Sequence, residues 1–109
     1  MEAPPKPIVS RYAEDPAFDE RIDRFVVGLG ERVDAFQDAE RLGDRIGLAT
    51  LAGALRSEAD ALGYPPLSEA AGHVAASCSD PSPDALRKSV FDLTEVTQRV
   101  RRGHRSAAS

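Results

Sequence analysis

Few residues of this chain are of types that perform chemistry, and they are widely separated. His73 and His104 are the two histidines, and Cys78 is the single cysteine. Neither histidine belongs to a His-x-x-x-His or Glu-x-x-His pair, and the chain has no glycine-rich phosphate loop. A single cysteine forms no intrachain disulfide. We therefore predict that the protein is not an enzyme and holds no metal or cofactor.

His73 is the one residue with a reaction to consider. An exposed imidazole nitrogen can attack a phosphorus centre, so phosphoryl transfer through His73 stays open as one interpretation. The alternative is an ordinary half-exposed helix residue beside the apolar Val74. His104 falls in the C-terminal tail, where we expect no chemistry.

Composition and charge indicate one soluble domain. The chain has 109 residues, of which 41% are hydrophobic, so it can bury one core without a metal or disulfide. Its net charge of −4 disfavours nucleic acid or an anionic membrane as a partner. No run of about 18 apolar residues occurs, and residues 1–10 lack a signal-peptide core. We expect a cytoplasmic protein.

Helical periodicity places most residues on four amphipathic helices. Apolar residues recur every three or four positions in the ranges 16–42, 45–62, 67–78 and 83–102. Asp15, Asp44 and Ser82 suit helix N-caps, and Gly43 and Gly63 suit helix ends. No strand pattern competes with these helices.

These elements predict an all-α fold. Short connections between four helices favour an antiparallel up-down-up-down four-helix bundle. We expect the bundle to cover residues 8–102 with a short N-terminal lead-in, and segments 1–7 and 103–109 to be disordered. Gly28 and Gly30 weaken the first helix, so we expect a bend there.

Gly53 is unexpected in the second of these helices. It stands in the segment "LATLAGALRSEADALGYPPLSEAA", residues 48–71, where leucines and alanines form the apolar face. Glycine costs a helix interior about 1 kcal/mol relative to alanine. The question is which residue a helix of this kind would otherwise have at that position.

This segment resembles the signature of histidine-containing phosphotransfer (HPt) domains. The matching residues are Leu51, Ala52, Leu55, Arg56, Gly63, Tyr64, Pro65, Leu67, Ser68 and Ala71. The stretch "FVVGLGERVDAFQDA" is similar to the family's first long helix, and Asp44 to the residue that opens its histidine-bearing helix. The resemblance covers roughly residues 8–101 and implies an HPt-like bundle.

Gly53 occupies the position of the family's phospho-accepting histidine. The resemblance therefore implies a degenerate member that carries no phosphate. Ser57 replaces the family's glycine one turn later, and Glu58 adds a negative charge nearby. Arg56 cannot replace the histidine, because its guanidinium stays protonated and has no lone pair. No shift of register places His73 in the motif.

The resemblance also implies a docking face on the outward side of the second helix, made of Ala49, Gly53, Arg56, Ser57 and Asp60. The implied partner is the receiver domain of a response regulator or a histidine-kinase module. A receiver's acidic pocket would complement Arg56. The leading hypothesis is a non-catalytic pseudo-HPt binding module of two-component or phosphorelay signalling. The alternatives are a structural or self-associating helical bundle, and phosphotransfer through the noncognate histidine at position 73.

Overall fold

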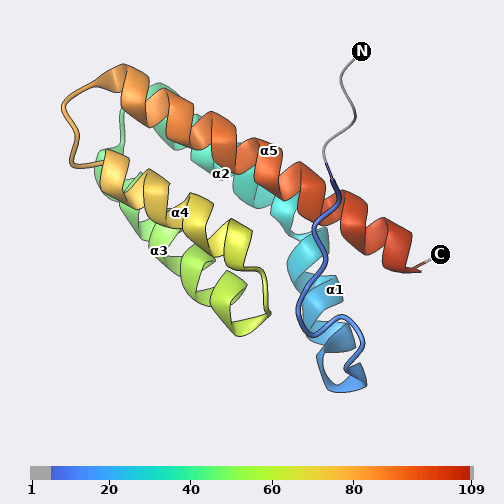
Figure 1. The fold of residues 1–109 in the computed structure, drawn as a ribbon. Helices are drawn as coiled ribbons and strands as arrows, with labels where there is room; N and C mark the ends of the chain where they lie inside the picture. Colours follow the sequence, from blue (N-terminus) through green and yellow to red (C-terminus); the bar gives the residue numbers. More distant parts are fainter. Residues whose placement is uncertain (1–5, 109) are drawn as a thin grey trace, which may run out of the picture.

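The computed structural model describes residues 6–108, with side chains as far as His104. Every regular element is helical, and no strand occurs among the described residues. The elements are a short 3-10 helix η1 (Pro16–Phe18), α1 (Asp19–Val27), α2 (Leu29–Leu42), α3 (Arg45–Ala61), α4 (Pro65–Ser77) and α5 (Pro83–Ala108) (Figure 1). The fold is an all-α helical bundle, which confirms the prediction from periodicity.

Helix ends are held by the capping residues that the sequence predicted. The Asp15 carboxylate accepts a hydrogen bond from the Ala17 N–H at 3.0 Å, and the Asp44 carboxylate accepts one from the Gly47 N–H at 2.8 Å. Gly43 ends α2 with φ of 70°, in the left-handed region that glycine enters without strain. Local side-chain chemistry therefore sets these boundaries.

The first predicted helix is divided at Gly28 into α1 and α2. Gly28 has φ of −80° and ψ of −6°, and its N–H still bonds to the Arg24 carbonyl at 3.2 Å. α1 is inclined to α2 at this point (Figure 1). The bend that we expected near Gly28 is confirmed.

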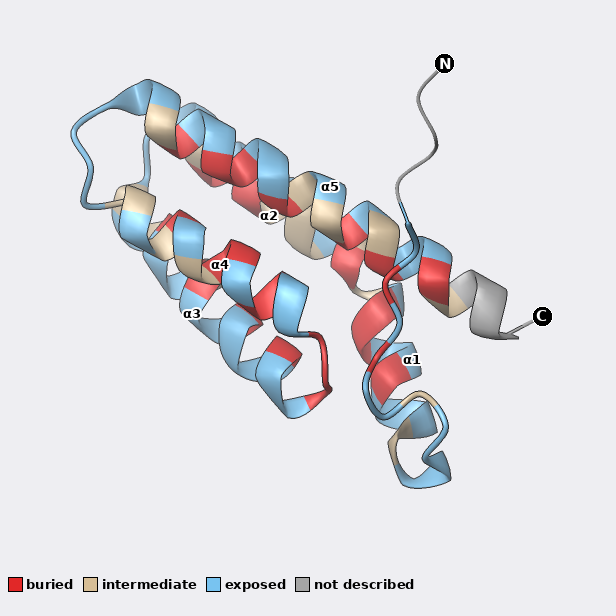
Figure 2. Cartoon of the chain, viewed as in Figure 1, coloured by how far each residue is buried: buried red, intermediate tan, exposed pale blue. Residues whose placement is uncertain are grey.

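The inward faces of the helices form one apolar core (Figure 2). Its largest fully buried apolar side chains come from α2, α3, α4, α5 and the α3–α4 connection: Leu29, Phe36, Leu48, Leu55, Tyr64, Leu67, Val74, Leu93 and Val100. Most of them lie on the apolar stripes predicted from the sequence. Burying such side chains is worth about 1.5–3 kcal/mol each, so this core is what holds the helices together.

An N-terminal strap, residues 6–12, crosses the bundle without regular secondary structure of its own. The Ile8 N–H donates to the Arg99 carbonyl at 3.0 Å, and the Arg11 N–H donates to the Gly63 carbonyl at 2.8 Å. The Arg99 guanidinium also donates to the Lys6 carbonyl at 2.8 Å. Of the segment expected to be disordered, residues 1–5 lie outside the described residues, whereas Lys6 and Pro7 belong to this strap.

α4 and α5 are longer than we expected. α4 begins at Pro65 rather than Leu67, because prolines suit the first turn of a helix, where no N–H bond is needed. α5 continues to Ala108, through the segment 103–109 that we expected to be disordered. Gly103 is buried under the strap, where a Cβ would collide with the Ile8 carbonyl. Ser109 lies outside the described residues.

Candidate functional site

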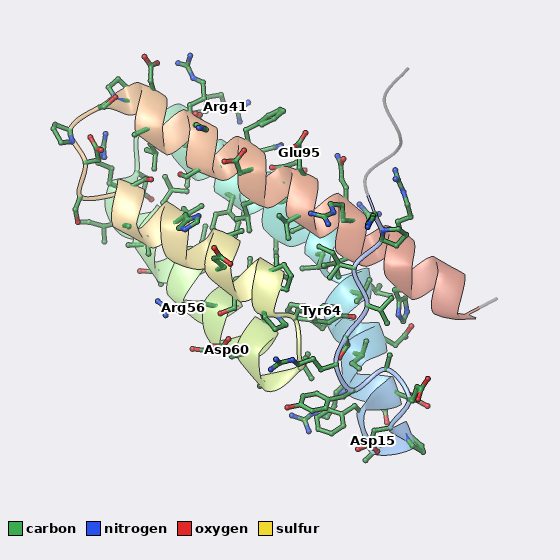
Figure 3. All side chains as sticks on the ribbon, in the orientation of Figure 1. Asp15, Arg41, Arg56, Asp60, Tyr64 and Glu95 are labelled. Carbon is green, nitrogen blue, oxygen red and sulfur yellow. The ribbon has the colours of Figure 1, made fainter. Side chains whose placement is uncertain are left out.

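The five residues predicted to bind a partner all lie on the exposed side of α3. We call Ala49, Gly53, Arg56, Ser57 and Asp60 the α3 face. Arg56 and Asp60 project from α3 at the edge of the molecule (Figure 3). The opposite side of the helix is buried through Leu48, Ala52, Leu55 and Ala59. Burial of that stripe therefore orients the α3 face toward solvent.

Gly53 has open space where a side chain would lie. A Cβ built at this position meets no heavy atom within 4 Å beyond its own helix. Its backbone is ordinary α-helix, because positive φ occurs only at Gly43 and Gly63 among the described glycines. Neither packing nor backbone conformation within this chain requires glycine at position 53.

Arg56 lies against Gly72 of the neighbouring helix α4. A Cβ added to Gly72 would lie 3.6 Å from Nη1 of Arg56 and 3.9 Å from its Nε. Contact at this distance is ordinary van der Waals packing, so the Arg56 side chain extends from α3 to the surface of α4. Arg56 forms no ion pair within the described part of the chain.

Arg56 and Asp60 line a shallow hollow of about 460 Å³ between α3 and α4. Glu69 and His73 of α4 line the same hollow. Two carboxylates therefore share this space with one permanent positive charge. An acidic partner would be attracted by close contact with the guanidinium itself, not by a broad positive field.

Glu58 does not add its charge to the α3 face as the sequence suggested. It forms an ion pair with Arg32 of α2, and the Arg32 guanidinium carbon also lies 5.6 Å from the centroid of the Phe25 ring. Glu58 is thus turned toward α2 and has a positive partner. The negative charge expected beside Gly53 is directed away from it and paired.

His73 and Cys78 differ in how far solvent reaches them. His73 is exposed on α4, where no second histidine joins it in the hollow. Cys78 is half-buried, and burial raises the pKa of its thiol while the positive charge of Arg45 acts in the opposite direction. The net rise favours the neutral, unreactive thiol. Among the described residues, no three His, Cys, Asp or Glu side chains are grouped to hold a metal ion.

Two exposed apolar residues at the end of α2 and the start of α3 were not identified from the sequence. Leu42, at the end of α2, is 79% exposed, and Ile46, in the first turn of α3, is 84% exposed. Ile46 precedes Gly53 by two helical turns and so lies on the same side of α3. Ile46 does not belong to the apolar stripe of Leu48 and Leu55, and this feature of the sequence could have identified it as an exposed apolar residue.

Comparisons with protein-family models, curated proteins and solved structures found no match. In the part of the chain that the structure describes, no helix combines the length and apolar character needed to cross a membrane. The function must therefore be inferred from the residues of this chain and their geometry.

Proposed function

We propose that this protein is a non-catalytic pseudo-HPt binding module of cytoplasmic two-component or phosphorelay signalling. It docks on a receiver domain or a histidine-kinase module through the α3 face, without carrying phosphate. The observation that carries the proposal is Gly53, which is exposed and uncovered in the middle of that face. A phosphoryl acceptor must be open to its partner, and position 53 is open but has no nucleophile.

An HPt-like, antiparallel up-down-up-down arrangement is part of the proposal. Its support is the shortness of the connections at 43–44, 62–64 and 78–82. Short connections favour antiparallel packing of consecutive helices. In this arrangement the partner would contact the middle of α3 and the adjoining edge of α4.

Arg56 supplies the charge by which a partner's acidic site would be recognised. Its guanidinium is charged at every physiological pH and presents a planar set of donors to carboxylates. Arg56 follows Gly53 by three residues and so lies on the same side of α3, and its guanidinium lies against Gly72 of α4. We therefore expect Arg56 to contact the acidic pocket of a receiver where a phosphohistidine would otherwise lie.

A binding titration tests this proposal. The purified protein is titrated with receiver domains from the same organism, and Arg56→Glu is compared with Arg87→Glu. Arg87 is an apt control because its side chain on α5 is 73% exposed and lies 3.9 Å from Glu40, so the same charge change occurs on another face. Saturable binding that Arg56→Glu abolishes and Arg87→Glu preserves supports the proposal. Equal loss in both variants, or no binding to any receiver or kinase module, contradicts it.

Leu42 and Ile46 favour self-association as a second candidate function. Large apolar side chains exposed at the surface are a common feature of protein interfaces, and Ile46 lies on the same side of α3 as Gly53. If this candidate is correct, light scattering gives the mass of a dimer or larger species for the wild type and that of a monomer for Ile46→Ser. A monomeric wild type excludes it and leaves the receiver proposal standing.

A further inference from the structure

A second hollow, separate from the α3 face, lies beneath the N-terminal strap. It has a volume of about 420 Å³ and is bounded by the strap, α1, the α3–α4 connection and the end of α5. Hollows that bind small molecules typically measure roughly 300–1,000 Å³ and combine apolar walls with a few polar groups. This hollow fits that description, so its polar groups indicate what it would bind.

Tyr64 contributes a hydroxyl group with no partner in the described part of the chain. Its side chain extends from the α3–α4 connection toward α1 (Figure 3), where its ring centroid lies 5.9 Å from that of Phe25. The residue is only 2% exposed, and among the described side chains no fully enclosed nitrogen or oxygen lacks a hydrogen-bond partner. The unbonded hydroxyl must therefore retain contact with open space, and the hollow that Tyr64 lines provides that space.

Two carboxylates one helical turn apart on α1 give the hollow a negative wall. Asp19 and Asp23 both line it, although like charges at this spacing repel each other. No described lysine or arginine lines the hollow, and the imidazole of His104 has its Nε2 3.0 Å from Oδ1 of Asp23. Asp19 forms no ion pair with any described residue. A bound cation would remove the repulsion.

The remaining wall of the hollow is apolar, and this lining indicates whether the bound cation would be a metal ion or an organic ion. Ile22 of α1 is buried, and Val9 of the strap remains 52% exposed beside the hollow. Among the described residues, no three acidic, histidine or cysteine groups converge on one point. An ammonium group on a small apolar body fits these walls better than a bare metal ion.

We propose that this hollow binds a small organic ammonium ion. The ammonium group lies against Asp19 and Asp23, the apolar body packs on Val9 and Ile22, and the Tyr64 hydroxyl faces the ligand. This inference is independent of the receiver proposal, because none of these residues belongs to the α3 face.

Benzylamine is a suitable probe, and benzyl alcohol is its uncharged match. The full chain is titrated with each compound at neutral pH and followed by nuclear magnetic resonance. We expect saturable shifts at Val9 and Ile22 with benzylamine, and binding of benzyl alcohol at least fivefold weaker. Asp19→Asn and Asp23→Asn should each weaken the binding of benzylamine about fivefold, a typical effect of losing one exposed charge partner.

Asp60→Asn is the control variant, since it removes the same charge from the α3 face. It should leave benzylamine binding unchanged, and circular dichroism confirms that each variant is folded. The comparison of benzylamine with benzyl alcohol uses only the wild-type protein, so this part of the test holds even if a variant fails to fold. Equal binding of the amine and the alcohol, equal weakening by Asp60→Asn, or no saturable binding of benzylamine would overturn the proposal.

Discussion

Gly53 and Gly63 are both glycines near α3, but the fold requires only one of them. Gly63 has φ of 79°, and a Cβ there would lie 2.8 Å from Cδ2 of Tyr12. Gly53 has helical backbone angles, and a Cβ built there would meet no heavy atom within 4 Å beyond its own helix. The glycine that the fold does not need is the one at the centre of the α3 face, which is why we assign it to recognition of a partner.

The first prediction concerns the stability of Gly53→Ala. Alanine restricts the unfolded chain and favours the helix, so the free energy of unfolding should rise by about 0.5–1 kcal/mol. Urea denaturation measures this change, with Gly63→Ala as a control that should destabilise the protein. A loss of stability in Gly53→Ala would show that position 53 is not open. If stability rises while receiver binding weakens, the clearance at position 53 serves the partner.

Tyr64 gives a prediction about pH. Burial raises the pKa of its hydroxyl from 10.0 to about 12. Both states hold the proton below pH 10, whereas between pH 10 and 12 the unfolded state loses it and the folded state keeps it. Stability therefore falls as pH rises through this range.

Tyr64→Phe should remove this part of the pH dependence. Urea midpoints of the variant and the wild type are expected to run parallel below pH 10. Above it the wild type should lose stability more steeply, since only it has this phenol. Parallel curves up to pH 12 would mean that the Tyr64 hydroxyl is solvated to the same degree in both states.

At the scale of elements, the close packing of the strap on α5 requires a glycine at position 103. A Cβ at this position would collide with the Ile8 carbonyl, which is backbone and cannot move alone. Gly103→Ala should therefore displace the strap and destabilise the protein by about 1–3 kcal/mol, the usual cost of overpacking. Thermal unfolding measures the loss, and Gly53→Ala provides the matched substitution in open space. An unchanged melting temperature would contradict the close packing of the strap on α5.

Much of the helical architecture was predictable because its causes are local. Asp15 and Asp44 cap helices through neighbouring N–H groups, and the stripe containing Leu48 and Leu55 follows from helical spacing alone. The extension of α5 was not predictable in this way. Within this extension Gly103 packs against Ile8, which lies near the other end of the chain, and periodicity along one helix does not indicate such a contact.

At the scale of the whole molecule, the two proposed surfaces differ in how far the sequence could indicate them. The α3 face comes from one helix, so periodicity and the HPt resemblance were enough to list its residues. The hollow beneath the strap brings Val9, Asp23, Tyr64 and His104 together from four separate segments. Only the tertiary fold brings such residues together. Glu58 illustrates the same limit, because its pairing with Arg32 of α2 could not be inferred from α3 alone.

The most direct test of the account is to map, by nuclear magnetic resonance, which amides of the full chain respond to a receiver domain from the same organism. We predict shifts concentrated at residues 46–60, with the largest near Gly53 and Arg56. The exposed side of α5 around Glu95 should be unaffected (Figure 3). Shifts centred on α5, or no response to any receiver or kinase module, would contradict the assignment of the α3 face as the docking surface.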